Sequence, residues 1–81
     1  MSNFISDADV NRMHARQAAE LIQVPAEDRR VVLMHAHFMQ NVSGGNLSGN
    51  LYSARLRYER MGAEAMAADD RDANDKLMGR V

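Results

Sequence analysis

Three histidines are the only side chains in this sequence that suggest a metal site or acid–base catalysis. His14 and His35 each fall on the apolar face of an expected helix, whereas His35 and His37 are two residues apart and point in different directions on a helix. Zinc-binding histidines in the HExxH motif are four residues apart, and no carboxylate follows His35 by one turn. We therefore expect these histidines to be satisfied by hydrogen bonds in a core or groove, with no bound metal and no cofactor.

Other catalytic patterns are weak as well. No serine stands in a nucleophile-elbow context, and no pair of carboxylates lies in an apolar stretch. Acid–base catalysis needs a pocket, and a domain of this size has little interior for one. The glycine-rich segment 43–50 lacks the lysine and the spacing of a phosphate-binding P-loop and follows no strand, so it reads as a helix–helix connection. We therefore predict no catalytic residues and no enzyme activity.

A segment rich in arginine and tyrosine is the strongest candidate for contact with another macromolecule. Its basic and aromatic residues are Tyr52, Arg55, Arg57, Tyr58 and Arg60. On a helix the three arginines fan widely around the circumference, and Glu59 and Glu64 lie among them as ion-pair partners. The connection before this segment is also longer than the turn of a helix-turn-helix motif. A helix that faces a protein partner is thus favoured over one that reads nucleic acid, which stays as an alternative.

Composition limits the class of protein further. The 81 residues carry ten basic and eleven acidic side chains, a net charge of −1, which is typical of neither a phosphate-binding domain nor an acidic mimic of DNA. Nine of the basic residues are arginine, and seven methionines indicate an adaptable core or contact surface. No cysteine is present to form a disulfide. The first ten residues lack the pattern of a secretory signal, and no apolar run exceeds four residues, so we expect a cytoplasmic protein without a membrane span.

The segment 51–68 predicts the helix around which the chain is organised. Its apolar residues recur at alternating intervals of three and four, which places them on one stripe, the seam of a helical hairpin or short coiled coil. The seam consists of Leu51, Ala54, Tyr58, Met61, Ala65 and Ala68. Tyr52 and Leu56 begin a weaker apolar strip roughly opposite to it. Gly62 lowers the helix propensity, so we expect another helix to approach closely at that residue.

Two further helices precede this one. Ser6 and Asp9 are spaced as a capping box, which starts a first helix expected over 7–23. Pro25 ends that helix and is well tolerated at the start of the next, expected over 25–42. The predicted inward face of the second helix is Val31, His35, Phe38 and Val42. Its predicted outward face is Arg29, Arg30, Leu33, His37 and Gln40.

The last residues of the chain differ in character from the seam. The stretch 69–76 is rich in aspartate and too polar to pack on the core, so it forms either a solvated extension of the third helix or a frayed end. Leu77, Met78 and Val81 follow as apolar residues without an evident place in the core. They are expected either to fray or to anchor on a partner or a second copy of the chain.

The predicted fold is all-α, one domain over residues 1–81 in which a helical hairpin with a long C-terminal helix follows an N-terminal helix. The predicted function is a non-enzymatic protein–protein interaction module that occludes or bridges a partner, in the style of phage accessory or inhibitor proteins, and self-association fits the same features. The alternatives are a nucleic-acid-associated regulator with an arginine-rich third helix and a structural subunit of a larger assembly. The residues expected to contact the partner are Tyr52, Arg55, Leu56, Arg57, Arg60, Leu77, Met78 and Val81.

Overall fold

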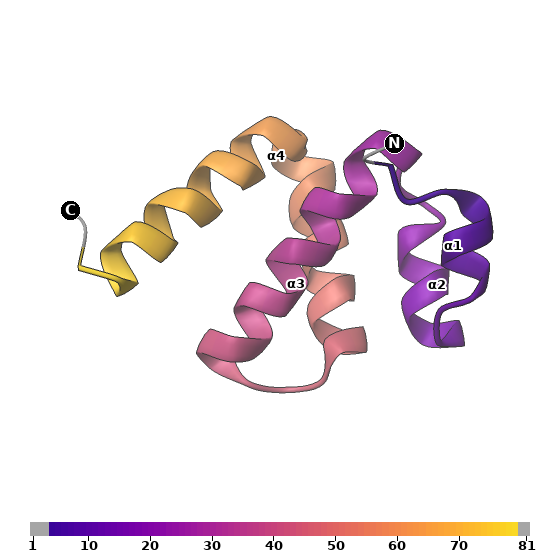
Figure 1. Cartoon of the computed structure of the whole chain (residues 1–81), viewed down its shortest axis with the longest axis horizontal. Helices are drawn as coiled ribbons and strands as arrows, with labels where there is room; N and C mark the ends of the chain where they lie inside the picture. Colours follow the sequence, from indigo (N-terminus) through magenta and orange to yellow (C-terminus); the bar gives the residue numbers. More distant parts are fainter. Residues whose placement is uncertain (1–3, 80–81) are drawn as a thin grey trace.

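The computed structural model describes residues 4–79, which form helices joined by short turns (Figure 1). In chain order the elements are α1 (Asp7–Asn11), α2 (Ala15–Leu21), the 3₁₀ turn η1 (Ala26–Asp28), α3 (Arg29–Ser43) and α4 (Leu47–Leu77). No strand occurs among residues 4–79, so the all-α prediction is confirmed. No helix in that range is both long and apolar enough to cross a membrane.

The N-terminal region departs from the prediction, because residues 7–23 form two short helices and not one. The expected capping box is present: Ser6 Oγ accepts from the backbone N–H of Asp9 at 3.1 Å, and the Asp9 carboxylate accepts from the Ser6 N–H at 3.3 Å. The chain then bends, and His14 caps α2 by accepting a hydrogen bond on Nδ1 from the backbone N–H of Arg16. His14 is therefore exposed at a helix start and does not lie on the apolar face.

The second helix begins and faces the core differently from the prediction. Pro25 precedes the 3₁₀ turn, and the regular helix α3 starts four residues after it. The buried residues of α3 are Arg29, Val32, His35 and Ala36. The predicted inward face is thus correct at His35 but wrong at Val42, which is exposed, and the predicted outward position of Arg29 is also wrong. The apolar pattern alone could not place this face, because α3 is apolar on more than one side.

The turn between α3 and α4 is short and pinned by side chains. Gly44 and Gly45 both adopt positive φ, 81° and 84°, which closes α3 in a conformation that favours glycine. Asn46 caps α4 by accepting a hydrogen bond from the backbone N–H three residues later at 2.7 Å. Asn50 Nδ2 donates to the carbonyls of Gly44 and Asn46 at 3.1 and 3.0 Å. As a result α4 begins at Leu47, four residues earlier than predicted, and Leu47 packs against the core.

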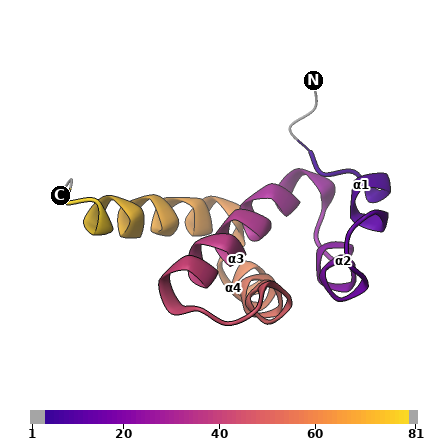
Figure 2. The same cartoon turned by 60° about the horizontal axis from the view of Figure 1, so that its bottom comes forward.

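A break at Gly62 divides α4 into two parts. Gly62 has φ 83° and ψ 165°, outside the helical region, so the chain changes direction there. Residues 47–61 run beside α3, and residues 63–77, here called the arm, lead away from the rest of the bundle (Figures 1 and 2). A Cβ added to Gly62 would meet nothing within 4 Å, so the expected close helix contact is wrong. Glycine is favoured at this position because the backbone has a positive φ.

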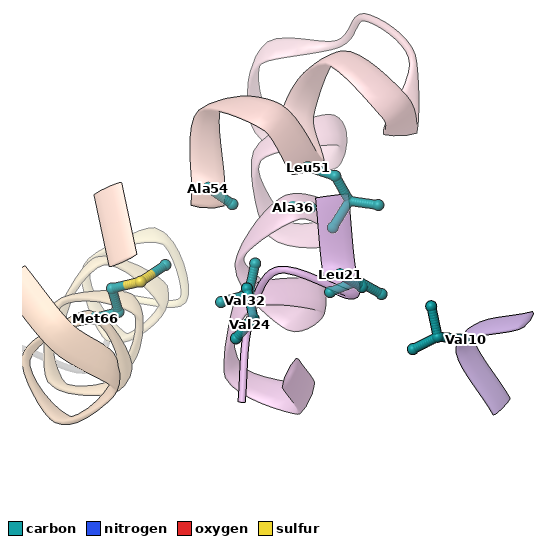
Figure 3. Close-up of a cluster of buried hydrophobic side chains, with 8 residues drawn as sticks. All are labelled: Val10, Leu21, Val24, Val32, Ala36, Leu51, Ala54 and Met66. Carbon is teal, nitrogen blue, oxygen red and sulfur yellow. The ribbon is translucent and has the colours of Figure 1, made fainter. Parts of the chain in front are cut away.

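The core joins all the helices (Figure 3). Its fully buried members are Val10, Leu21, Val24, Val32, Ala36, Leu51, Ala54 and Met66. The predicted seam is correct for Leu51 and Ala54, while Tyr58 and Met61 are half-buried. Beyond Gly62 the seam fails, because the break rotates the following turns and buries Met66 in place of Ala65. The periodicity predicts one uninterrupted helix, whereas a single non-helical residue, Gly62, changes the face that is buried after it.

Candidate partner-binding groove

An apolar groove lies between α3 and the arm. It has a volume of about 400 Å³ and is lined by Val31, Met34, Phe38, Ala67, Asp70, Arg71 and Asn74. The α3 side of the groove is entirely apolar, and Met34 is 61% exposed there. The arm contributes a small alanine on one side and polar or charged groups toward its end. A concave apolar surface edged by a few polar groups is the usual form of a binding site.

Three contacts fix the position of the arm beside this groove. Met66 is fully buried in the core and anchors the first turn of the arm. His35 Nδ1 and Asp70 Oδ1 are 2.6 Å apart, and since an ionised carboxylate only accepts, the imidazole donates through Nδ1–H. Arg57 Nη2 pairs with Asp69 Oδ2 at 3.1 Å across the break at Gly62. The expectation that the aspartate-rich stretch is too polar to pack on the domain is therefore wrong for its first two residues.

The arginine cluster of the prediction does not form one contact surface. Arg55 has a largely buried side chain that pairs with Glu20 on α2 at 2.7 Å and with Glu59 at 2.6 Å. Its guanidinium carbon also lies 5.6 Å from the centre of the Tyr52 ring. The hydrogen bond to Glu20, followed by the other contacts with Glu20 and Glu59, raises the pKa of Arg55 despite its partial burial. Arg55 thus joins α4 to α2, and Arg57 joins the two parts of α4.

Three other predicted residues do lie together on the exposed side of α4. Tyr52, Leu56 and Arg60 are each four residues apart, so they form one row on the helix. Tyr52 and Leu56 are exposed hydrophobic side chains. With Ser53 and Glu59, Leu56 and Arg60 line a second, more open hollow that shares no residue with the groove.

The C-terminal residues of the prediction occupy a third place. Leu77 is the last residue of α4 and Met78 is its C-cap. Both are exposed, and the break at Gly62 separates them from the row of Tyr52, Leu56 and Arg60. Val81 lies outside the residues that the structure describes. The predicted contact residues are therefore spread over distinct surfaces, and the groove itself was not predicted. Two of its α3 residues, Val31 and Phe38, belong to the predicted inward face, because the sequence does not show that the arm diverges from α3.

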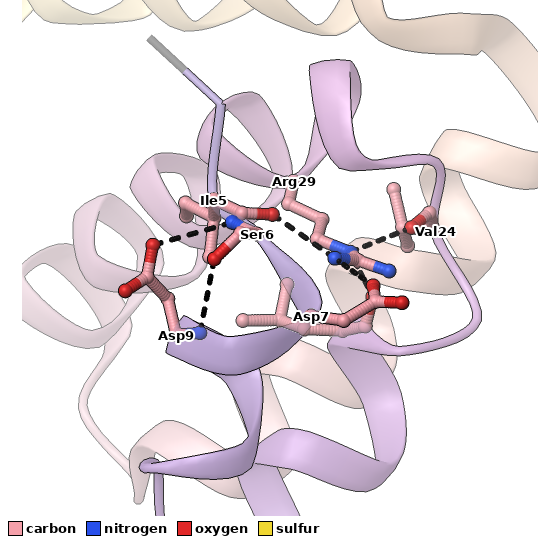
Figure 4. A network of polar contacts seen from close by, with 7 residues as sticks. Ile5, Ser6, Asp7, Asp9, Val24 and Arg29 are labelled. Atoms are coloured by element: carbon pink, nitrogen blue, oxygen red, sulfur yellow. Dashed lines mark hydrogen bonds and ion pairs between the residues drawn. The ribbon is translucent and has the colours of Figure 1, made fainter. Parts of the chain in front are cut away.

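Arg29 is the polar residue that the sequence analysis missed most clearly (Figure 4). It is 4% exposed, and its Nε donates to the carbonyls of Leu21 and Val24 at 2.9 and 2.8 Å. Its Nη1 donates to the carbonyl of Ile5 at 3.0 Å and pairs with Asp7 Oδ1 at 2.7 Å. The only sequence signal is an arginine shortly after Pro25, where the carbonyls at the end of the preceding helix lack partners. Arg29 holds the corner of the fold and is not a contact residue.

Tyr58 links the first part of α4 to the turn before α3 and makes stability depend on pH. Its O–H donates to Asp28 Oδ2 at 2.6 Å. This hydrogen bond, then partial burial and the charges of Asp28 and Glu27, raises the pKa of Tyr58 from 10.0 to about 12. Because the folded state holds the phenol proton more tightly than the unfolded state, this contribution to stability is complete below pH 10.0 and is lost as the pH rises to about 12.

Tyr58→Phe is therefore expected to lower the free energy of unfolding by about 1 kcal/mol below that range, the usual value of one hydrogen bond. The difference between the two proteins should shrink as the pH rises through the range, as measured by urea unfolding at each pH. Other groups that titrate at high pH are common to both proteins and cancel. A difference that does not change with pH would show that the bond to Asp28 does not raise this pKa.

The residues of the groove and its surroundings are suited to binding an apolar surface and not to coordinating a metal ion. Among residues 4–79, no group of three or more His, Cys, Asp or Glu side chains is arranged to hold a metal ion. Of the three histidines only His35 is buried, and its Nδ1 is hydrogen-bonded to Asp70. The arrangement presents an apolar floor, a flexible methionine and an exposed arginine at one edge.

Comparison with known proteins identifies no relative: no family model, no curated protein and no solved structure matches this chain.

Proposed function

We propose that this chain is a small, non-enzymatic protein-binding module that receives an amphipathic helix of a partner protein in the groove between α3 and the arm. The observation that carries this proposal is the row of Val31, Met34 and Phe38, which lines an open groove. Val31 also packs against the core, whereas Met34 and Phe38 are not members of it. Helix-in-groove binding uses such a surface, with apolar anchors one helical turn apart on the ligand. Binding there would occlude the partner helix or bridge it to whatever the module itself contacts.

The chemistry of the groove restricts the partner helix. Met34 and Phe38 supply an adaptable apolar floor, since the unbranched methionine side chain adjusts to different shapes. Asp70 is already paired with His35, whereas Arg71 is exposed at the edge. An apolar stripe flanked by a carboxylate that reaches Arg71 therefore fits this groove better than a basic helix does.

Met34→Glu tests the proposal. This substitution places a charge on the groove floor at an exposed site, so it should change stability by no more than about 0.5 kcal/mol. The tagged variant is expected to lose at least about tenfold in capture of a partner from the source cells, because a buried unpaired charge is costly. Quantitative mass spectrometry of the captured proteins measures the loss, and circular dichroism checks the fold.

Leu56→Glu is the matched control. It introduces the same charge on an exposed hydrophobic residue of α4 outside the groove. Capture should persist in this variant. Loss of capture with Leu56→Glu and retention with Met34→Glu would reject the groove and place the binding surface on the row of Tyr52, Leu56 and Arg60.

The alternative of a nucleic-acid-associated regulator has less support. Arg55 and Arg57 are paired with carboxylates, and Arg60 is the member of the predicted set that forms no ion pair with residues 4–79. One arginine beside exposed Tyr52 is a small footprint for binding to phosphates, and the net charge is −1. The resemblance to phage accessory proteins is one of composition alone.

A further inference from the structure

We infer that the arm exchanges between two copies of this chain, forming a dimer in which α4 is one continuous helix and each arm packs on α3 of the other copy. This inference does not depend on what occupies the groove. It rests on three features: the conformation of Gly62, the helical preference of its neighbours, and the contacts that the arm makes with the rest of the chain.

The non-helical backbone conformation of Gly62, the hinge, conflicts with the helix propensity of the residues on either side. Its φ of 83° and ψ of 165° lie in a region populated almost only by glycine. The residues on either side, Met61, Ala63, Glu64 and Ala65, are mostly strong helix formers, and no proline follows Pro25 in the chain. The local sequence therefore favours a helix that continues through residue 62. Only the packing of the arm keeps the break in place.

The contacts of the arm are few and transferable. They include the burial of Met66, the pair of His35 with Asp70, and the pair of Arg57 with Asp69. In a continuous helix Arg57 and Asp69 would be about 18 Å apart along the axis, so Arg57 could pair only with the arm of another copy. Exchange restores all of these contacts between two chains and relaxes both hinges, so the dimer needs no new interface.

The dimensions of the molecule make a straight α4 accessible to a second copy. Its 31 residues would extend about 46 Å, which exceeds the longest dimension of the domain, 39 Å. The arm already leads away from the bundle in the closed form (Figure 2). A straightened α4 therefore carries Met66 and Asp70 beyond its own core, where only another copy can bury them.

Gly62→Ala tests the inference, and Gly79→Ala is its matched control. Alanine is strained at the present φ of residue 62 and favours a continuous helix, although its Cβ would meet no atom. At each hinge the equilibrium between the bent and the straight helix should shift by about tenfold toward the straight helix. Because a dimer contains two hinges, its dissociation constant should fall by about 100-fold. Gly79 also has positive φ and open space around it, but it follows the end of α4. Light scattering should show a doubled mass for Gly62→Ala at concentrations where Gly79→Ala and the native chain are monomers.

Distance measurements identify the straight helix within that dimer. The chain has no cysteine, so spin labels at Ser53→Cys and Lys76→Cys report one distance on exposed sites of α4. Labelled chains diluted with unlabelled ones should give about 35 Å in the Gly62→Ala dimer, the length of 23 helical residues, and a shorter distance in the native monomer. A dimer that keeps the monomer distance would overturn the inference, because it would form through another surface.

Two further outcomes are decisive. A Gly62→Ala protein that keeps native helicity and stays monomeric at millimolar concentration would overturn the inference. If Gly62→Ala does not fold, the native chain refolded from denaturant at millimolar concentration takes its place, since exchange occurs readily while arms are open. A dimer fraction with the long spin-label distance would then support exchange, and its absence would reject it.

Discussion

Arg29→Ala is expected to lower the free energy of unfolding by about 3–5 kcal/mol, the largest single effect that the structure predicts. The substitution removes the guanidinium that donates to the carbonyls of Ile5, Leu21 and Val24. The Leu21 carbonyl keeps its bond from the backbone N–H of Val24, but the loss of the Arg29 donors from buried carbonyls is costly, and a cavity would form where the side chain lay. Small domains have only about 5–15 kcal/mol in total, so the melting temperature should fall steeply. Urea unfolding monitored by circular dichroism measures the change.

Two neighbours of this network provide controls. Arg30→Ala makes the same substitution on an exposed residue and should cost less than about 0.5 kcal/mol. Asp7→Asn removes the ionic partner of Arg29 but leaves its carbonyl bonds, and Asp7 is 73% exposed, so the cost should stay below about 1 kcal/mol. Equal effects of Arg29→Ala and Arg30→Ala would contradict the role of Arg29 at this corner.

Leu51→Ala is expected to cost about 2–5 kcal/mol. Leu51 is fully buried, and it lies in the core with residues from α2 and α3, so its removal leaves a cavity that the surrounding helices fill only in part. The same substitution at Leu56, which is 39% exposed on the same helix, should cost less than about 1 kcal/mol. Thermal and urea unfolding of the two variants give the comparison. Similar losses for both would mean that α4 faces the core with a different side.

Tyr58, which the periodicity predicts as a central anchor, is expected to matter less than Leu51. Its ring is half-buried, and part of its contribution is the hydrogen bond to Asp28 and not packing. The periodicity gave the correct face for this part of α4 but could not rank the residues on it. Depth of burial depends on where α2 and α3 cross the helix, and sequence spacing does not contain that information.

The sequence predicts correctly those features of the fold that depend on interactions between residues close together in the chain. The all-α class, the capping box of Ser6 and the end of a helix before Pro25 each depend on residues within one turn of one another. The division of the first helix at His14 was not predicted, because the apolar pattern continues across it. The burial of Arg29 depends on segments up to 24 residues away, and its only local signal is its position shortly after Pro25.

The groove could not be predicted for a related reason. It exists because the arm diverges from α3, and that divergence arises at Gly62, a residue whose presence is equally compatible with a close contact or a weak helix. The exposed row of Tyr52, Leu56 and Arg60 was visible in the sequence, since it follows simple helical spacing. Sites formed by one helix are readable from spacing, whereas a site between two helices requires the angle between them.

The short turn between α3 and α4 bears on how the chain folds. Its side-chain bonds, from Asn46 and Asn50, join residues no more than six apart, so they need no distant segment. Closing so short a loop costs little entropy and takes well under a microsecond, and contacts that are local in sequence favour rapid folding. The bond from Arg29 to Ile5 spans 24 residues and has to wait for the N-terminal segment to dock. We therefore expect folding to begin at the α3–α4 hairpin. The N-terminal segment and the arm are expected to dock on this hairpin last.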